Sequence, residues 1–293
     1  MINTVILSWT TFIYFAAFAF YLVRMVSVRE RWGRLGAATA RIGLFAHTAA
    51  LILRWVASYQ MGMGHAPLSN LYESLIFFAW SIMALYLIVE WRTKSRSLGT
   101  FVVPVAFLCM AFASLSPNIS SRIQPLIPAL QSNWLTSHVI TCFMGYAAFT
   151  VAFATGLMAL LKGMERRART GDGSAIYGKN ANPSPMNFIR LIPAPGILDE
   201  LIYQSTVLGF VFLTIGIMTG SIWAHYAWGA YWSWDPKETW SLITWLVYAV
   251  MLHARHVRGW RGQRMAVMAI IGFICVLITY LGVNYLPGLH SYQ

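Results

Sequence analysis

Residues 203 to 240 read YQSTVLGFVFLTIGIMTGSIWAHYAWGAYWSWDPKETW, an apolar run of helical length that passes directly into a segment crowded with tryptophan. The first part, 203 to 223, matches the roughly 20 mainly apolar residues that a helix needs to cross a hydrocarbon core about 30 Å thick. This stretch therefore predicts a transmembrane helix that ends at an aromatic loop.

The same apolar pattern recurs along the chain, which is 58% hydrophobic and 10% charged, with a mean hydropathy of +0.59. Such a composition is too apolar for an ordinary soluble domain. No break in the sequence suggests a second domain, so we predict one all-α, polytopic membrane helix bundle over residues 1–293. About eight transmembrane helices are expected, at 4–23, 39–59, 71–91, 98–116, 137–161, 203–223, 239–256 and 266–284.

Basic residues are unevenly divided between the two ends of these spans. When the eight spans are threaded back and forth, 18 of the 21 Lys and Arg residues fall on one side, and Arg54, Arg122 and Lys237 fall on the other. The positive-inside rule makes the 18-charge side cytoplasmic and places both termini outside. The net charge of +12 therefore reflects topology rather than nucleic-acid binding. The segment from about 162 to 202 becomes a cytoplasmic connector of turns and irregular backbone.

The aromatic segment from about 223 to 240 then lies on the extracytoplasmic side, and residues 223 to 245 hold six of the thirteen tryptophans. An interfacial aromatic belt explains one or two tryptophans per helix end. This density instead creates a large π surface that suits a flat, apolar ligand such as a porphyrin. A dense belt and a protein interface are the alternatives. The candidate ligand contacts are Trp228, Trp232, Trp234, Asp235 and Trp240.

The carboxylates beside this segment also have a local explanation. Residues 235–238, DPKE, fit the N-cap and first three positions of a helix, with a capping box between Asp235 and Glu238. Asn70 and Glu73 form a similar pair before the third span. Capping does not exclude a role in binding, because a capping carboxylate also shapes the loop that it closes.

Seven histidines are present, and their predicted depth in the membrane sorts them. His47 and His253 fall in the inner halves of two spans, whereas His138 and His290 fall at the outer surface, before and after the aromatic segment. Two neutral imidazoles can bind one haem iron, so these four residues form two candidate axial pairs at two depths. An inter-helix hydrogen bond is the alternative for a lone intramembrane histidine. The histidines not expected to be ligands are His65, His225 and His256.

Arg54 follows His47 by seven residues, which places it on nearly the same helix face and about 10 Å further out. It is expected to meet a haem propionate or to snorkel to the outer interface. The three cysteines lie in or beside apolar spans without a C-x-x-C pair, which argues against a zinc site and a dithiol redox motif.

The run WGAYWSWDPKETW resembles the WWD motif of haem-handling proteins. Further landmarks narrow the resemblance to the CcsA family, also called ResC, of System II cytochrome c maturation. Eight spans distinguish this pattern from the CcmC type, which has six, and from the much longer CcmF type. The landmarks cover nearly the whole chain: PLSNLYES at 67–74, WLTSHV at 134–139, LHAR at 252–255 and GLHSY at 288–292.

This resemblance implies a function in haem delivery. His138 and His290 would be the axial ligands of haem b presented on the aromatic loop, and His47 and His253 the intramembrane pair that holds haem on its way outward. The haem would be attached to the C-x-x-C-H thiols of an exported apocytochrome c. The chain would form part of a cytochrome c synthase, together with a CcsB or ResB subunit and a thiol-reducing thioredoxin-like protein. The expected location is the plasma (inner) membrane, or the thylakoid membrane in a plastid or cyanobacterium.

Three alternative functions make different predictions for this chain. A b-type haem electron carrier would hold its haems between histidines inside the helices. A small-solute transporter would use the tryptophans as an outer gate, and its binding would survive loss of the histidines. A scaffold without a ligand would be colourless after purification. No catalytic nucleophile or general base is expected.

Overall fold

The computed structural model describes residues 2–126, 130–170 and 187–285, and within them the chain is helical without strands. The eight α-helices are α1 (Ile2–Ser27), α2 (Glu30–Gln60), α3 (Leu71–Thr93), α4 (Gly99–Leu115), α5 (Asn133–Thr170), α6 (Pro195–Trp228), α7 (Pro236–Arg258) and α8 (Gln263–Tyr280). Short 3-10 turns are η1 (Arg96–Leu98), η3 (Asn187–Leu191) and η4 (Gly282–Tyr285). The prediction of an all-α helix bundle is confirmed.

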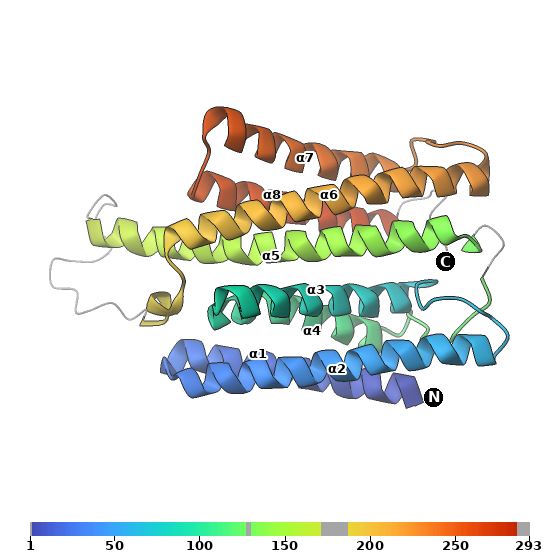
Figure 1. Ribbon diagram of the computed structural model, residues 1–293, viewed down its shortest axis with the longest axis horizontal. Helices are drawn as coiled ribbons and strands as arrows, with labels where there is room; N and C mark the ends of the chain where they lie inside the picture. The colour runs from blue at the N-terminus through green and yellow to red at the C-terminus, as the bar shows by residue number, and fades with distance from the viewer. Residues whose placement is uncertain (1, 127–129, 171–186, 286–293) are drawn as a thin grey trace.

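The helices form two halves that meet along α5 (Figure 1). In the N-terminal half, α1 and α2 pair as a hairpin that packs on α3 and α4. In the C-terminal half, α6, α7 and α8 lie on the other side of α5. Because α5 contacts both halves, much of its apolar part is buried inside the bundle.

Seven of the described helices are long and apolar enough to cross a membrane. The remaining one, α7, carries charged residues in both its first and its last turn. These charges lower the mean hydropathy of α7, although it lies alongside α6 and α8 as the predicted seventh span requires (Figure 1). The chain is therefore a polytopic membrane protein.

Two predicted loops are partly helical. α5 continues to Thr170 and α6 begins at Pro195, so the expected connector over 162–202 is helical at both ends. Residues 171–186, between them, lie outside the described residues. Likewise, the aromatic segment 223–240 contains the end of α6 and the start of α7, which leaves only residues 229–235 without helix. The sequence boundaries follow hydropathy, but charged residues such as those at 162–170 are good helix formers and continue a helix beyond its apolar part.

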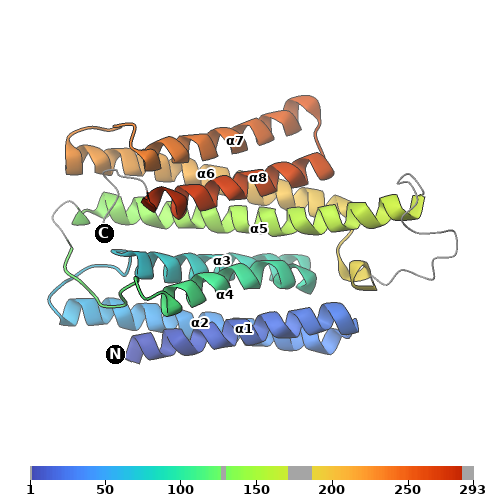
Figure 2. The same cartoon turned by 180° about the vertical axis from the view of Figure 1, so that it is seen from behind.

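The end of the bundle that holds residues 229–235 is here called the aromatic end. The start of α1 and the finish of α8 lie at the same end (Figure 2). This arrangement follows from an even number of antiparallel helices.

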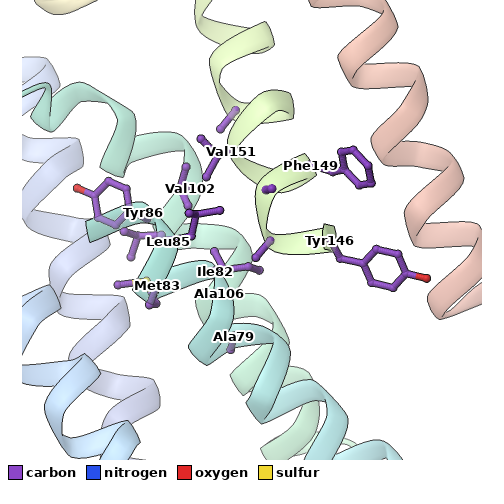
Figure 3. Packing of buried hydrophobic residues seen from close by; sticks show 14 of the residues in the cluster. Ala79, Ile82, Met83, Leu85, Tyr86, Val102, Ala106, Tyr146, Phe149 and Val151 are labelled. Atoms are coloured by element: carbon purple, nitrogen blue, oxygen red, sulfur yellow. The ribbon is translucent and has the colours of Figure 1, made fainter. Parts of the chain in front are cut away.

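Interdigitating side chains hold the two halves together (Figure 3). Ala79 of α3, Ala106 of α4 and Val151 of α5 belong to one cluster of buried side chains. From the opposite face of α5, the Phe149 ring stacks on that of Tyr248 in α7, with centroids 3.6 Å apart and planes 4° from parallel. Both rings are fully buried, so α5 is locked to both halves of the bundle.

Both predicted capping pairs are present. The Asn70 side chain accepts a hydrogen bond from the Glu73 backbone N–H at 2.9 Å, which caps α3. Asp235 and Glu238 form the capping box of α7. In the latter, Glu238 Oε2 also accepts hydrogen bonds from Ser233 N and Ser233 Oγ, at 2.7 and 3.1 Å.

Arg54 does not snorkel to the outer interface. Its Nε donates to Glu73 Oε1 at 2.8 Å, and both side chains are 1% exposed. The second oxygen, Glu73 Oε2, accepts hydrogen bonds from Ser69 N and Ser69 Oγ at 2.8 and 2.6 Å. Burial explains the difference from the expectation, because a guanidinium that cannot reach water must find a counter-ion within the bundle.

Candidate functional site

The connection between α6 and α7 is a short turn, and it contains a residue with a strained backbone conformation directly before the N-cap of α7. α6 stops at Gly229, whose φ of 79° is easily adopted only by glycine. Trp234 also has a positive φ, 59°, which is costly for a bulky residue. Its side chain is nevertheless 69% exposed. Backbone strain that displays a large aromatic side chain to the outside is typical of a functional site.

The tryptophans in and beside this turn form a partly open surface, here called the aromatic surface. Its members are Trp223, Trp228, Trp232, Trp234 and Trp240. The rings of Trp223 and Trp228 lie 4.7 Å apart, and those of Trp232 and Trp234 lie 5.9 Å apart, both in edge-on geometry. Trp223 is buried beneath, whereas Trp228, Trp232 and Trp240 are half-buried. The aromatic surface is thus anchored from below and accessible from outside, as a stacking ligand requires.

His138 joins this surface from α5. Its ring lies nearly parallel to that of Trp223, 13° apart with centroids at 6.3 Å. Its Nδ1 lies 2.7 Å from the carbonyl oxygen of Gly216 in α6. A neutral imidazole that donates from Nδ1 carries its lone pair on Nε2, which is the form that ligates a metal. The hydrogen bond to Gly216 therefore favours the tautomer of His138 in which Nδ1 carries the proton.

Two glycines of α6 make this placement of His138 feasible. A Cβ on Gly220 would lie 2.5 Å from His138 Nδ1, and one on Gly216 would lie 2.6 Å from Cys142 Sγ. Their i, i+4 spacing puts both on the face of α6 that receives α5. Sequence reasoning missed these two residues, although paired small residues in an apolar span are a signal of close helix packing.

One cationic residue follows the turn directly. Lys237 is half-buried in the first turn of α7, where its backbone N–H donates to Asp235 Oδ1 at 2.9 Å. Cys142 Sγ lies 3.7 Å from His138 Nδ1. Burial lowers the pKa of the Lys237 ammonium, while the Asp235 carboxylate opposes that shift.

His290, the predicted second outer ligand, lies outside the described residues. The chain leading to it is anchored at the aromatic end, where the hydroxyls of Tyr280 in α8 and Ser74 in α3 lie 2.9 Å apart. The short turn η4 then ends at Tyr285, five positions before His290. The segment that carries His290 therefore starts at the end of the bundle that carries His138.

The structure does not bring His47 and His253 together. His47 is fully buried on α2, where its Nδ1 lies 3.1 Å from the hydroxyl of Tyr14 in α1. His253 is exposed on α7, in the other half of the bundle (Figure 1). The predicted pair across one iron is not formed within this chain, because sequence gives a residue's depth but not its lateral position.

The three histidines not expected to bind iron have other contacts. Both ring nitrogens of His65 lie 2.9 Å from backbone carbonyl oxygens, those of Ala66 and Gln124. His225 stacks on Tyr231 at 4.2 Å. His256 Nε2 lies 3.3 Å from the Tyr203 hydroxyl, at the end of the bundle opposite the aromatic surface.

Comparisons with known proteins agree with this arrangement. Residues 68–290 match the family model described as cytochrome C assembly protein. A Synechococcus protein named cytochrome c biogenesis protein CcsA is 42% identical over 95% of this chain and 94% of its own length. A protein of the same name from Microcystis aeruginosa is 40% identical over 98% of this chain and 94% of its own length.

A solved structure has the same fold. The chain named cytochrome c heme lyase CcmF superposes on 95% of this chain with a TM-score of 0.69, at 18% sequence identity. The present chain spans 46% of that protein's length.

Proposed function

Because the chain belongs to the cytochrome c assembly protein family, we propose that it presents haem at its aromatic end for covalent attachment to an apocytochrome c. The observation that carries this proposal is His138. Its ring is stacked over Trp223 and hydrogen-bonded through Nδ1 to Gly216, beside an outward-facing aromatic surface. A porphyrin on that surface would receive an imidazole ligand from α5.

The described residues fit haem b as a substrate. Trp228, Trp232 and Trp234 offer aromatic faces for a flat macrocycle, and Asp235 holds their loop through the cap of α7. Trp240 lies on the first turns of that helix and ties it to α8, since its carbonyl oxygen accepts a hydrogen bond from Thr279 at 3.1 Å. His290 would supply the second axial ligand from the segment after α8.

The attachment chemistry is thioether formation. Each thiol of a C-x-x-C-H motif adds its S–H across one haem vinyl group, so an S–C bond and a C–H bond form without a leaving group or an oxidant. The part of this chain is to position the vinyl edge and to hold the iron between imidazoles until the histidine of the apocytochrome replaces one of them. No side chain is needed as a nucleophile.

An inner haem site at His253 would need a partner chain. Its ring is exposed on α7, together with the neighbouring apolar residues Val250 and Val257, which are 56% and 68% exposed. His47 is too deeply buried in the other half to share an iron with it. We propose that a CcsB or ResB type subunit covers this face of α7 and supplies the second ligand. This makes the synthase a complex, with a thioredoxin-like protein to keep the apocytochrome thiols reduced.

The proposed orientation follows the charge distribution. Arg54, Arg122 and Lys237 lie toward the aromatic end, and the other Lys and Arg residues of the described ranges lie toward the opposite end. The positive-inside rule therefore places the aromatic end outside the cytoplasm, in the plasma membrane or the thylakoid membrane.

A b-type electron carrier is the second candidate. It requires histidine pairs that face each other between helices inside the membrane. The separation of His47 from His253 disfavours it, and the position of His138 at the end of the bundle favours presentation to an outside partner.

The test is the visible spectrum of the protein purified from haem-supplied membranes, compared with His138→Ala, His290→Ala and the control His256→Ala. We expect a haem spectrum in the wild type and the control, and its loss or marked change in the two outer variants. A colourless wild type would overturn the proposal, and so would an unchanged spectrum in His138→Ala.

A further inference from the structure

We propose that the turn between α7 and α8 binds the headgroup of an anionic phospholipid, whose acyl chains lie along the exposed face of α8. This turn lies at the end of the bundle opposite the aromatic surface (Figure 2). The inference goes beyond the proposed function, because it concerns the membrane as a partner and does not involve haem.

The turn has a defined conformation that a buried carboxylate holds in place. Residues 259–262 join the two helices, and Asp199 of α6 accepts hydrogen bonds from Gly262 N at 2.7 Å and from the Arg255 guanidinium at 2.8 Å. Gly259 and Gly262, with φ of 62° and 60°, let the chain reverse over this short distance. Trp260 lies between them, half-buried and packed against the core. The side chains of the turn therefore leave the bundle from fixed positions.

Three exposed arginines surround this turn, and they are Arg258, Arg261 and Arg264. The guanidinium of Arg264 lies 5.7 Å from the ring centroid of Trp260. Among the described residues, neither Arg258 nor Arg261 forms an ion pair. Residues 239–293 contain no Asp or Glu, so neither α8 nor α7 beyond its first turn supplies a counter-ion. The turn thus presents three positive charges to the outside of the bundle.

Other cations at this end of the bundle are neutralised within the chain. In the N-terminal half, Arg24 Nε lies 2.9 Å from Glu30 Oε2, and Arg41 lies 3.3 Å from Glu90 Oε2. The charge of the α7–α8 turn is left for a partner outside the chain.

The apolar residues that follow Arg264 indicate that this partner is a lipid. Val267, Ile271 and Ile274 are 44%, 43% and 49% exposed. Steps of three, four and three residues from Arg264 put these side chains on one face of α8. At 1.5 Å per residue, the stripe extends about 15 Å from Arg264, which is about half of a hydrocarbon core roughly 30 Å thick. A soluble polyanion needs the cations alone, whereas a phospholipid uses both the cations and the apolar stripe of one leaflet.

The chemistry of the turn suits a phosphate headgroup. A guanidinium can donate two parallel hydrogen bonds to one phosphate group. Tryptophan is enriched at the headgroup level of membranes, which is the depth that Trp260 would occupy. The proposed orientation of the chain places the turn at the cytoplasmic surface, where anionic lipids are concentrated. An anionic phospholipid of that leaflet therefore matches the turn in charge and in depth.

The test uses phosphatidylglycerol that carries a photoreactive diazirine group in one acyl chain. The full-length protein is purified in detergent, freed of bound lipid and irradiated with increasing amounts of this probe. Labelled peptides are then identified by mass spectrometry. We expect saturable labelling of α8 that unlabelled phosphatidylglycerol prevents, and that phosphatidylcholine and glycerol phosphate at the same concentration leave unchanged.

The first variant removes the charge of the turn by combining Arg258→Gln, Arg261→Gln and Arg264→Gln. One basic residue near an anionic lipid surface contributes about fivefold in affinity. The probe concentration that half-saturates α8 labelling should therefore rise on the order of a hundredfold in this variant. A second variant with Lys at the same three positions keeps the charge and should bind with about the wild-type affinity. Thermal unfolding in the same detergent checks that both variants are folded.

The matched control removes three exposed arginines at the same end of the N-terminal half, by combining Arg29→Gln, Arg31→Gln and Arg34→Gln. It changes the net charge of the protein equally and should leave α8 labelling unchanged. An equal loss of labelling in this control would show that net charge alone attracts the probe, and would overturn the proposal.

The remaining outcomes are equally decisive. Unchanged labelling in the first variant would overturn the role of the arginines, and equal competition by phosphatidylcholine would overturn recognition of the headgroup charge. Competition by glycerol phosphate would assign the turn to a soluble phosphate compound in place of a lipid. None of these measurements depends on haem, so failure of this inference is distinguishable from failure of the proposed function.

Discussion

The interior of the N-terminal half and the aromatic end present their functional candidates in opposite ways. In the N-terminal half, Arg54 and Glu73 are 1% exposed and paired with each other, and His47 is buried against Tyr14. At the aromatic end, His138 of α5 and Trp234 lie at or near the surface of the bundle. Both kinds of residue stand out equally in the sequence, because any polar group in an apolar span suggests function. Burial separates the ion pair inside the N-terminal half from the residues at the aromatic end that can meet a substrate.

The largest expected effect comes from breaking the buried ion pair. Arg54→Met leaves the Glu73 carboxylate buried without its counter-ion, so the free energy of unfolding should fall by about 3–5 kcal/mol. Equilibrium unfolding in detergent measures this loss. The haem spectrum per folded molecule should not change, because Arg54 lies outside the aromatic site.

The double variant Arg54→Met with Glu73→Met sharpens this prediction. Removal of both charges should restore most of the lost stability, since no unpaired ion remains. If Arg54→Met loses haem while its stability is retained, Arg54 belongs with the functional residues, and the contrast between the interior of the N-terminal half and the aromatic end fails.

His47→Ala tests the same contrast at a predicted ligand. The substitution removes the partner of the Tyr14 hydroxyl and leaves a cavity, so the free energy of unfolding should fall by about 2–4 kcal/mol. The absorption spectrum of bound haem should keep its wild-type shape. A shifted or missing haem band in the folded variant would indicate that His47 is an iron ligand.

The sequence predicted those features that depend on local signals. Apolar runs of sufficient length identified all eight helices, and the residue types at 70–73 and 235–238 identified two caps. Helix ends were less accurate where charged residues continue a helix beyond its apolar part, as α5 does to Thr170. Hydropathy indicates where the membrane-spanning part of a helix ends, but the helix itself can continue beyond the membrane.

Features that depend on which helices are neighbours were missed. The pairing of Arg54 with Glu73 and the contact of His138 with Gly216 each join two helices that the sequence does not place side by side. For the same reason, depth alone made His47 and His253 look like a pair. Both lie within spans, yet they belong to opposite halves of the bundle (Figure 1).

Gly220→Ala tests the outer haem site without replacing the proposed iron ligand His138. The added Cβ would lie 2.5 Å from His138 Nδ1, so the ring must shift and its hydrogen bond to Gly216 must weaken. Overpacking of this kind costs about 1–3 kcal/mol of unfolding free energy. Haem affinity should fall at least about tenfold, given the sensitivity of a ligating imidazole to its orientation. The matched control is Gly196→Ala, where an added Cβ meets nothing within 4 Å; equal haem affinity in the two variants would contradict the proposed role of His138.

Trp234→Gly has the smallest expected effect on stability, and its sign differs from that of the other variants. Trp234 adopts a φ of 59° while its side chain is 69% exposed, so the bundle gains little from its burial and bears the cost of a left-handed backbone. Glycine adopts this conformation without that cost, and the free energy of unfolding should rise by about 1 kcal/mol. Loss of the exposed indole should at the same time weaken haem binding about threefold to tenfold, the usual worth of one aromatic contact. A variant that is more stable and binds haem less well would show that the strain at Trp234 is maintained for the ligand, whereas a less stable variant with unchanged haem binding would assign Trp234 to the packing of the bundle.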